Sequence, residues 1–405
     1  MWISNVSIVL PDRILAAGSL RIEDGCITEI VENAPNENPD DGGQTNLVVL
    51  PGIVDLHGDM LEREIEPRPG ALFPIDLSLI ELDKRLASAG VTTAFAAVSF
   101  WESERRRLRT DKNAVNIIET IVRLRPHLLV DFCVHARYEI STPVVAPSVR
   151  HVIERGWVQL VSLMDHTPGQ GQYRDMERYY DFMAKWVDKS RDEVVQITQK
   201  RLAGLPPETE IWQAANQIAG LARQHGLPLA SHDDDTPEKV SLVTGLGATL
   251  SEFPVSLEAA QAARRHGMNI IMGAPNALRD ESTSGNLTAR QGLAAGVTDI
   301  LAADYHPASL LHAAWELAQA GVLPLYEAVN LISRNPAEAV GLHDRGGIAV
   351  GKRADLVVVE AGLLPRVRTT FRCGVPIYDD HQLARKAQPF VAFSHAGPAI
   401  AWVPG

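Results

Sequence analysis

The sequence is poor in cysteine and has no long uncharged hydrophobic run. Its three cysteines, Cys26, Cys133 and Cys373, lie far apart and form no C-x-x-C pair, which excludes a disulfide framework and a thiolate zinc site. No apolar stretch is long enough for a membrane-spanning helix. Pro11 and Asp12 interrupt the region where a secretory signal needs an unbroken apolar stretch. We therefore expect a protein of the reducing cytoplasm.

Positive charge is also in short supply. The 38 basic and 50 acidic residues leave a formal net charge of −12, so nothing in the balance favours nucleic acid or an anionic membrane as a partner. An anionic small molecule would have to be held by local charge. With 45% hydrophobic and 22% charged residues, the chain has the composition of a folded globular protein. The oligomeric state stays open, a homo-oligomer included.

The middle of the chain alternates short apolar runs with longer segments of helical period, a pattern typical of parallel strands joined by helices. Eight such runs are present, at 53–56, 91–98, 128–139, 158–164, 227–231, 249–253, 269–272 and 299–303. Eight strand–helix units are what a (β/α)8 TIM barrel requires. We therefore expect an α/β fold with a barrel domain over residues 51–340.

Both ends of the chain contain short strand-like segments separated by turn signals. We expect residues 1–50 and 341–405 to form one accessory β-sandwich domain. Within the barrel, the stretch 167–207 is much longer than a usual connection between strands. It is either a lid over the functional site or additional helical packing, and the sequence does not decide between the two.

Side chains of metal-ligand type follow the predicted barrel strands at their carboxyl ends. His57 and Asp59 follow the first apolar run, and their i, i+2 spacing points both side chains the same way from an extended backbone. Four further candidates end or follow later runs: Glu139, His166, His232 and Asp304. Since the carboxyl ends of barrel strands lie on one face, we expect all six side chains to converge there.

Three imidazoles and three carboxylates suit a divalent transition metal, with zinc as the default, manganese or iron as alternatives, and one or two ions per chain. Any one histidine taken alone is more often a hydrogen-bonded structural residue, but their joint placement favours the metal interpretation. The predicted chemistry is metal-assisted hydrolysis, in which a bound ion lowers the pKa of water. We assign catalytic roles to Asp304, as the group that orients the nucleophile and accepts its proton, and to His232.

Three segments of the sequence resemble the amidohydrolase superfamily: PGIVDLH at 51–57, the Thr92-Thr93 strand and GKRADL at 351–356. The resemblance spans essentially the whole chain and implies a metal-bearing barrel with a small β-sandwich. Two features depart from the usual pattern. His57-x-Asp59 replaces a pair of histidines, and no lysine stands where a carboxylated bridging lysine is expected. Glu139 is the candidate bridge in its place.

Longer motifs narrow the resemblance to the PhnM family of diphosphatases, which act in phosphonate catabolism by the carbon–phosphorus lyase pathway. They are DMLE at 59–62, PRPG at 67–70, LVSLMDHTPGQ at 160–170, SHDD at 231–234, EFP at 252–254, GMN at 267–269, MGAPN at 272–276, SGN at 284–286 and DYHPASLL at 304–311. The resemblance implies hydrolysis within the 5-triphosphate of a ribose 1-methylphosphonate, with release of pyrophosphate. The implied ligand is thus a phosphorylated sugar phosphonate.

A triphosphate needs positive charge around it. Arg68, Arg137 and Arg279 lie in or beside the motif segments, and we nominate them with Asn276 as substrate ligands. Arg137 shares strand parity with Glu139, so it is expected inside the barrel, where a structural ion pair is the alternative to a phosphate contact.

Other catalytic machinery is missing from the sequence: there is no G-x-x-x-x-G-K-[ST] loop, no G-x-G-x-x-G after a strand and no G-x-S-x-G elbow. Two other functions remain open. The same ions could polarise the carbonyl of an amide or cyclic amide, or the barrel could be a catalytically silent scaffold. Product analysis distinguishes the two hydrolases, and failure to take up metal would favour the scaffold.

Overall fold

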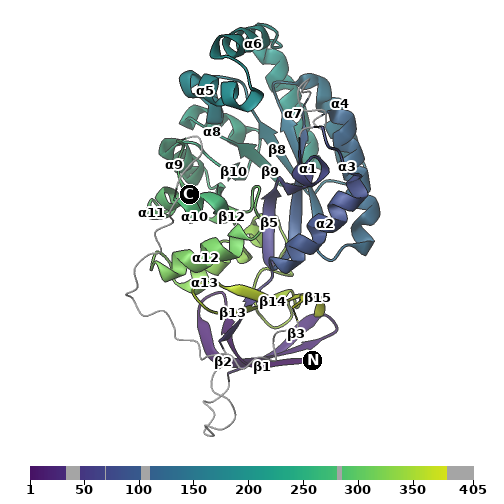
Figure 1. Ribbon diagram of the computed structural model, residues 1–405, viewed down its shortest axis with the longest axis vertical. Coiled ribbons are helices and arrows are strands. Elements are labelled where there is room, and N and C mark those ends of the chain that lie inside the picture. The colour runs from purple at the N-terminus through teal and green to yellow at the C-terminus, as the bar shows by residue number, and fades with distance from the viewer. Residues whose placement is uncertain (33–45, 69, 102–109, 281–284, 381–405) are drawn as a thin grey trace.

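The structure, a computed structural model, describes residues 1–32, 46–68, 70–101, 110–280 and 285–380. Within these ranges the strands form two sheets, one of eight strands and one of seven (Figure 1). The seven-stranded sheet lies at one end of the molecule, and most of the helices surround the other sheet. None of the described helices is long and apolar enough to cross a membrane.

The eight-stranded sheet is a parallel barrel. Its strands are hydrogen-bonded in chain order: β5 (Ile53–Gly58), β6 (Val91–Phe100), β7 (Asp131–Glu139), β8 (Leu160–Met164), β9 (Leu229–His232), β10 (Leu250–Glu252), β11 (Asn269–Gly273) and β12 (Ile300–Ala302). A bridge between Gly58 and Asp304 brings the last strand back to the first. Each strand overlaps one predicted apolar run, so the expected α/β barrel is confirmed.

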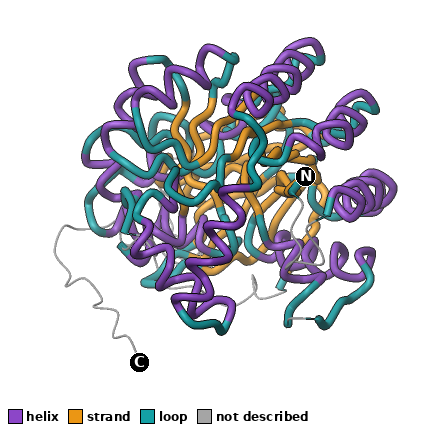
Figure 2. Tube along the Cα trace, turned by 90° about the horizontal axis from the view of Figure 1, so that it is seen from above, coloured by secondary structure: helices purple, strands orange, loops and turns teal. Residues whose placement is uncertain are grey.

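Helices form a ring around the barrel strands, as Figure 2 shows from above. They are α1 (Met60–Ile65), α2 (Ile75–Ser88), α3 (Asp111–Leu124), α4 (Ala146–Glu154), α5 (Met176–Val187), α6 (Arg191–Ala203), α7 (Glu208–Gln224), α8 (Pro237–Gly245), α9 (Leu257–Arg265), α10 (Ala274–Arg279), α11 (Ala289–Ala294), α12 (Ser309–Gln319), α13 (Leu325–Asn330) and α14 (Arg334–Ala339). Short 3-10 turns lie at Arg125–His127, Pro143–Val145 and Gly171–Tyr173. Thr236 and Ser256 are the N-cap residues of α8 and α9, and their hydroxyls accept hydrogen bonds from backbone N–H groups of the first turn.

Both ends of the chain contribute to the seven-stranded sheet, as the sequence predicts. Its order is β15-β14-β13-β4-β1-β2-β3, formed by β1 (Trp2–Val9), β2 (Ile14–Glu23), β3 (Cys26–Glu32), β4 (Leu47–Pro51), β13 (Leu356–Glu360), β14 (Arg366–Arg372) and β15 (Val375–Asp379). β4 joins the two halves, since it pairs with β1 on one side and β13 on the other. Two parts of the predicted accessory domain, residues 33–45 and 381–405, lie outside the described residues.

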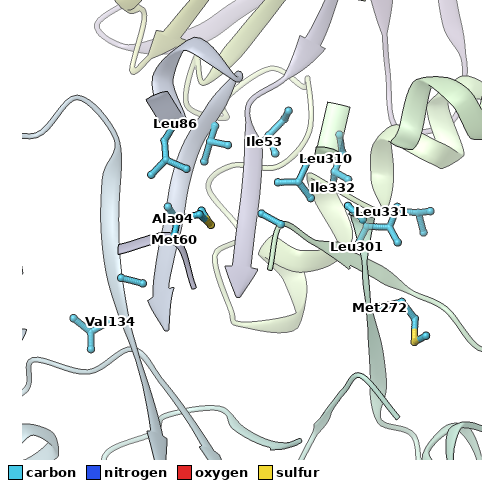
Figure 3. Packing of buried hydrophobic residues seen from close by; sticks show 14 of the residues in the cluster. Ile53, Met60, Leu86, Ala94, Val134, Met272, Leu301, Leu310, Leu331 and Ile332 are labelled. Atoms are coloured by element: carbon cyan, nitrogen blue, oxygen red, sulfur yellow. The ribbon is translucent and has the colours of Figure 1, made fainter. Parts of the chain in front are cut away.

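Apolar side chains fill both faces of the barrel wall. Val54, Leu160 and Ile300 belong to a cluster formed mainly by strand residues. A larger cluster packs the strands against the helices and includes Ile53 and Leu310, both labelled in Figure 3. Burying such side chains contributes about 1.5–3 kcal/mol each, so this packing is the main source of stability.

A single residue, Gly52, separates β4 of the accessory sheet from β5 of the barrel. Its N–H donates to the carbonyl of Asp355 at 2.7 Å. A β-carbon at this position would overlap the side chain of Thr92. The sequence therefore needs glycine here, because the two parts of the molecule approach too closely for any side chain.

An ion network ties the amino-terminal end of the barrel to the returning chain. Asp131, at the start of β7, accepts from Nη1 of Arg345 at 2.6 Å and of Arg353 at 3.3 Å. The Arg345 side chain is 8% exposed and also donates to Thr93. Burial alone would raise the pKa of Asp131, but its bonds to the two arginines outweigh burial and hold the pKa below its usual range.

We expect Asp131→Asn to lower the free energy of unfolding by about 1–3 kcal/mol at neutral pH, because it leaves the buried Arg345 without this carboxylate. A depressed pKa in the folded state contributes stability above the unfolded value of about 3.9, and that stability is lost as pH falls through the folded pKa. Urea unfolding should therefore show a difference that shrinks below about pH 4. The exposed Asp12→Asn serves as the control. If Asp131→Asn lowered the free energy of unfolding equally at neutral pH and below about pH 4, the prediction would be contradicted.

Candidate metal centre

The six predicted ligand residues all lie at the carboxyl end of the barrel. His57, Glu139 and His232 fall within the last two residues of β5, β7 and β9, and His166 and Asp304 lie two residues beyond β8 and β12. Asp59 follows β5 directly, and its N–H donates to the carbonyl of Asp304 at 2.7 Å. Backbone pairing across the barrel seam therefore brings together the first and last residues of the set.

The backbone is unusual at three positions around this end of the barrel. Asp233, Phe253 and Asp304 have φ of 57°, 53° and 54°. Residues other than glycine seldom adopt this left-handed region, and such positions cluster at functional sites. In this chain they follow β9, β10 and β12, where each strand turns out of the barrel.

His57 lies between two carboxylates. Its Nδ1 is 3.0 Å from Oε1 of Glu252, and its Nε2 is 3.5 Å from Oδ1 of Asp59. Burial alone would lower the pKa of His57, but the negative charge of Glu252 and the Asp59 contact raise it to about 10. The same carboxylates that favour a proton on this imidazole would favour a divalent cation beside it.

His166 and His232 form a second group with two other acids. Nδ1 of His166 is 2.7 Å from Oε2 of Glu139, whose other oxygen accepts from Ser141. Nε2 of His166 lies 3.6 Å from Oδ2 of Asp233, and the same oxygen lies 3.1 Å from Nδ1 of His232. Glu139 thus orients His166 and leaves its Nε2 facing Asp233.

Arg137 joins the two groups inside the barrel. Nη1 donates to Oδ1 of Asp59 at 2.6 Å, and Nη2 lies 3.2 Å from Nε2 of His232. Burial lowers the pKa of His232, so its neutral ring accepts this bond. The structural ion pair that the sequence left as the alternative to a phosphate contact is present, with Asp59. Nε of Arg137 has no hydrogen-bond partner among the described residues.

Asp304 has the electrostatics of a proton acceptor near neutral pH. Burial, followed by the charge of Asp59, raises its pKa to about 6. Its N–H donates to the carbonyl of His57 at 2.9 Å. Beneath it, the buried carboxylate of Asp55 accepts the N–H groups of His57 and Ala303, which fixes both strand ends.

The residues present fit a divalent metal. Two sets of side chains each bring three ligand atoms within 4.8 Å of one another: His57, His232 and Glu252 form one, and His166, His232 and Asp233 form the other. Among the described residues, Oε2 of Glu252 is buried without a hydrogen-bond partner. Nδ1 of His232 and Oδ2 of Asp233 are buried 3.1 Å apart but are not aligned for a hydrogen bond. Buried nitrogen and oxygen atoms left in this state are costly unless a cation binds them.

Sequence reasoning did not select Glu252, Asp233 or His135. The signal for the first two was present, because Glu252 ends a predicted strand and Asp233 follows His232. His135 lies inside β7, where Nδ1 donates to the carbonyl of Leu56 and Nε2 accepts from Ser162. Burial lowers the pKa of His135 to about 3, so it is a neutral residue of the barrel interior.

The other residues nominated as substrate ligands also follow carboxyl ends of barrel strands, but they lie in the segments beyond those ends. Arg68 is exposed in the turn that follows α1. Asn276 and the exposed Arg279 lie on α10, which begins directly after β11. From the long 167–207 stretch, Arg201 reaches the site and donates to the carbonyl of His166 at 3.2 Å.

Comparison with known proteins agrees with this geometry. The amidohydrolase family matches residues 161–378. The chain is 36% identical over 367 residues to the α-D-ribose 1-methylphosphonate 5-triphosphate diphosphatase of Escherichia coli K12, covering 88% of this chain and 94% of that protein.

Solved structures show the same fold at low identity. A 5-methylcytosine deaminase from Klebsiella pneumoniae has a TM-score of 0.61 at 17% identity, covering 94% of this chain and 98% of that one. A dihydropyrimidinase from Brevibacillus agri has a TM-score of 0.57 at 14% identity, covering 98% and 99%. Fold and sequence thus agree, and the chain belongs to the amidohydrolase family.

Proposed function

We propose that this chain is a metal-dependent diphosphatase that hydrolyses α-D-ribose 1-methylphosphonate 5-triphosphate to the 5-phosphate and pyrophosphate. In this proposal it works in the cytoplasm, as one step of phosphonate breakdown by the carbon–phosphorus lyase pathway. The observation that carries it is the buried imidazole–carboxylate cluster, in a chain 36% identical to a diphosphatase of that name. The cluster supports hydrolysis, and the identity supports this substrate.

The proposed metal ligands are the six residues predicted from sequence, together with two acids that the structure adds. They are His57, Asp59, Glu139, His166, His232 and Asp304, with Asp233 and Glu252. Zinc, manganese and iron all fit nitrogen and oxygen donors of this kind. A bound ion supplies charge stabilisation and lowers the pKa of water.

The chain's own residues supply the remaining functions. Asp304, with its pKa raised to about 6, is suited to accept the proton of the attacking water. Arg137 holds Asp59 and His232 in place, and its unpartnered Nε–H can donate to a phosphoryl oxygen. Arg68, Arg279 and Asn276 are proposed as outer substrate contacts. Water forms one new P–O bond as the bridging P–O bond between the α- and β-phosphoryl groups breaks, and the pyrophosphate leaves with its charge balanced by these donors.

The direct test supplies purified protein with zinc, manganese or iron and measures pyrophosphate released from the ribose 5-triphosphate substrate. Release with at least one metal is the expected result. Parallel incubations with a hydantoin and an N-acyl amino acid measure amine formation instead. Amine without pyrophosphate would indicate an amidohydrolase, and neither product in a protein that takes up no metal would indicate a silent scaffold.

Glu252→Gln should weaken metal binding about 10–100-fold, because it removes the charge that faces Nδ1 of His57. Titration of the metal-free protein with zinc, followed by calorimetry, gives the affinity directly. The exposed Glu154→Gln on α4 is the matched control. If both variants bind zinc like the wild type, Glu252 has no role at the metal.

Asp304→Asn should lower kcat by about 10²–10⁴-fold, because an amide cannot accept the proton of water. Steady-state pyrophosphate release measures kcat, and elemental analysis of the same samples shows whether the metal is retained. A variant that keeps both its metal and near wild-type kcat would exclude Asp304 as the base.

A further inference from the structure

Two arginines near the candidate metal centre stack on aromatic rings. The guanidinium of Arg63, on α1, lies 5.1 Å from the ring centroid of Tyr305, the residue after Asp304. The guanidinium of Arg201, on α6, lies 5.4 Å from the ring of Trp101. Tyr305 is next to the proposed ligand Asp304 in the chain, and Trp101 contacts the proposed ligand His166 in space.

The contact on the Arg201 side extends to the ligand itself. The Trp101 ring is stacked on the imidazole of His166, with centroids 5.6 Å apart and planes 6° apart. Arg201 lies over the Trp101 ring and also donates to the backbone carbonyl of His166. A residue of the long 167–207 stretch is thus held at the metal centre.

The contact on the Arg63 side lies beside Asp304 in the chain. Arg63 lies over the ring of Tyr305, the residue that follows Asp304. Arg63 itself is exposed. It is therefore a cation open to solvent, close to the proposed base.

The two arginines contact different strand ends of the barrel mouth. Tyr305, beneath Arg63, follows β12, whereas Trp101 and His166, which Arg201 contacts, follow β6 and β8. The proposed ligands Asp304 and His166 belong to these two groups of strand ends. A molecule bound across the centre could therefore meet one arginine at each end.

Neither arginine forms an ion pair within the described part of the chain. Nearby surface arginines do, as Arg85 with Glu64 and Arg123 with Asp76 show. A guanidinium over an aromatic ring can still donate its N–H groups to phosphate and phosphonate oxygens. In Arg201, Nη2 already donates to the carbonyl of His166, and the other N–H groups remain for a ligand. The positive charge of each arginine is therefore not offset by an ion pair and can act on an external anion.

We propose that Arg63 and Arg201 are specificity-determining residues that bind the two anionic ends of the substrate, one the triphosphate and the other the phosphonate. This rests on the proposed function, whose substrate carries phosphorus groups at both ends of a sugar. A ligand with one anionic end would use only one of the two arginines.

The kinetic test compares Arg63→Ala and Arg201→Ala on two substrates, the complete substrate and ribose 5-triphosphate without the phosphonate. Each variant should raise KM for the complete substrate about tenfold or more, with little change in kcat. On the truncated substrate only one of them should keep that penalty. Arg150→Ala, which removes an exposed arginine from α4, should leave both KM values unchanged.

A binding test is independent of turnover. Calorimetry with inorganic tripolyphosphate should show weakened binding to one metal-loaded variant and wild-type binding to the other. Thermal unfolding checks that both variants are folded. Equal loss in both variants, wild-type affinity in both, or no binding to the wild-type protein would overturn the proposal. A wild-type protein that binds tripolyphosphate selectively in this way but releases no pyrophosphate would contradict the proposed function and leave this inference standing.

Discussion

The structure depends on gathering negative charge inside a barrel. Five carboxylates meet at its carboxyl end, those of Asp59, Glu139, Asp233, Glu252 and Asp304. Arg137 supplies one permanent positive charge among them. Uncompensated charge in a buried site costs several kcal/mol per ion. One or two divalent cations would balance this excess. The electrostatics that make the folded chain costly without a cation are therefore the same ones that would make it a catalyst.

The barrel separates this strained end from the end that supports it. At the amino-terminal ends of the strands, Asp131 accepts hydrogen bonds from Arg345 and Arg353. At the carboxyl ends, several buried polar atoms lack partners and three residues have left-handed backbone. TIM barrels commonly divide stability and activity between opposite faces in this way. The apolar clusters between the two ends keep the ligand residues in place.

Much of this organisation could be predicted from the sequence, because apolar runs mark barrel strands and the residues that follow them share a face. His57 and Asp304 were placed together on that basis, and the backbone bonds across the seam join them. Side-chain partners could not be predicted. Glu252 contacts His57 across 195 positions, and that pairing depends on how the curved sheet brings β10 opposite β5. Periodicity specifies which side chains point inward but not which of them meet.

The connection through Gly52 has a consequence for how the protein can move. Hinge bending between two bodies needs a few residues free to change their backbone angles. Gly52 is the residue between β4 and β5, and it is bonded to Asp355 and packed against Thr92. Its backbone angles therefore have little room to change, so Gly52 does not act as a hinge between the sheet and the barrel.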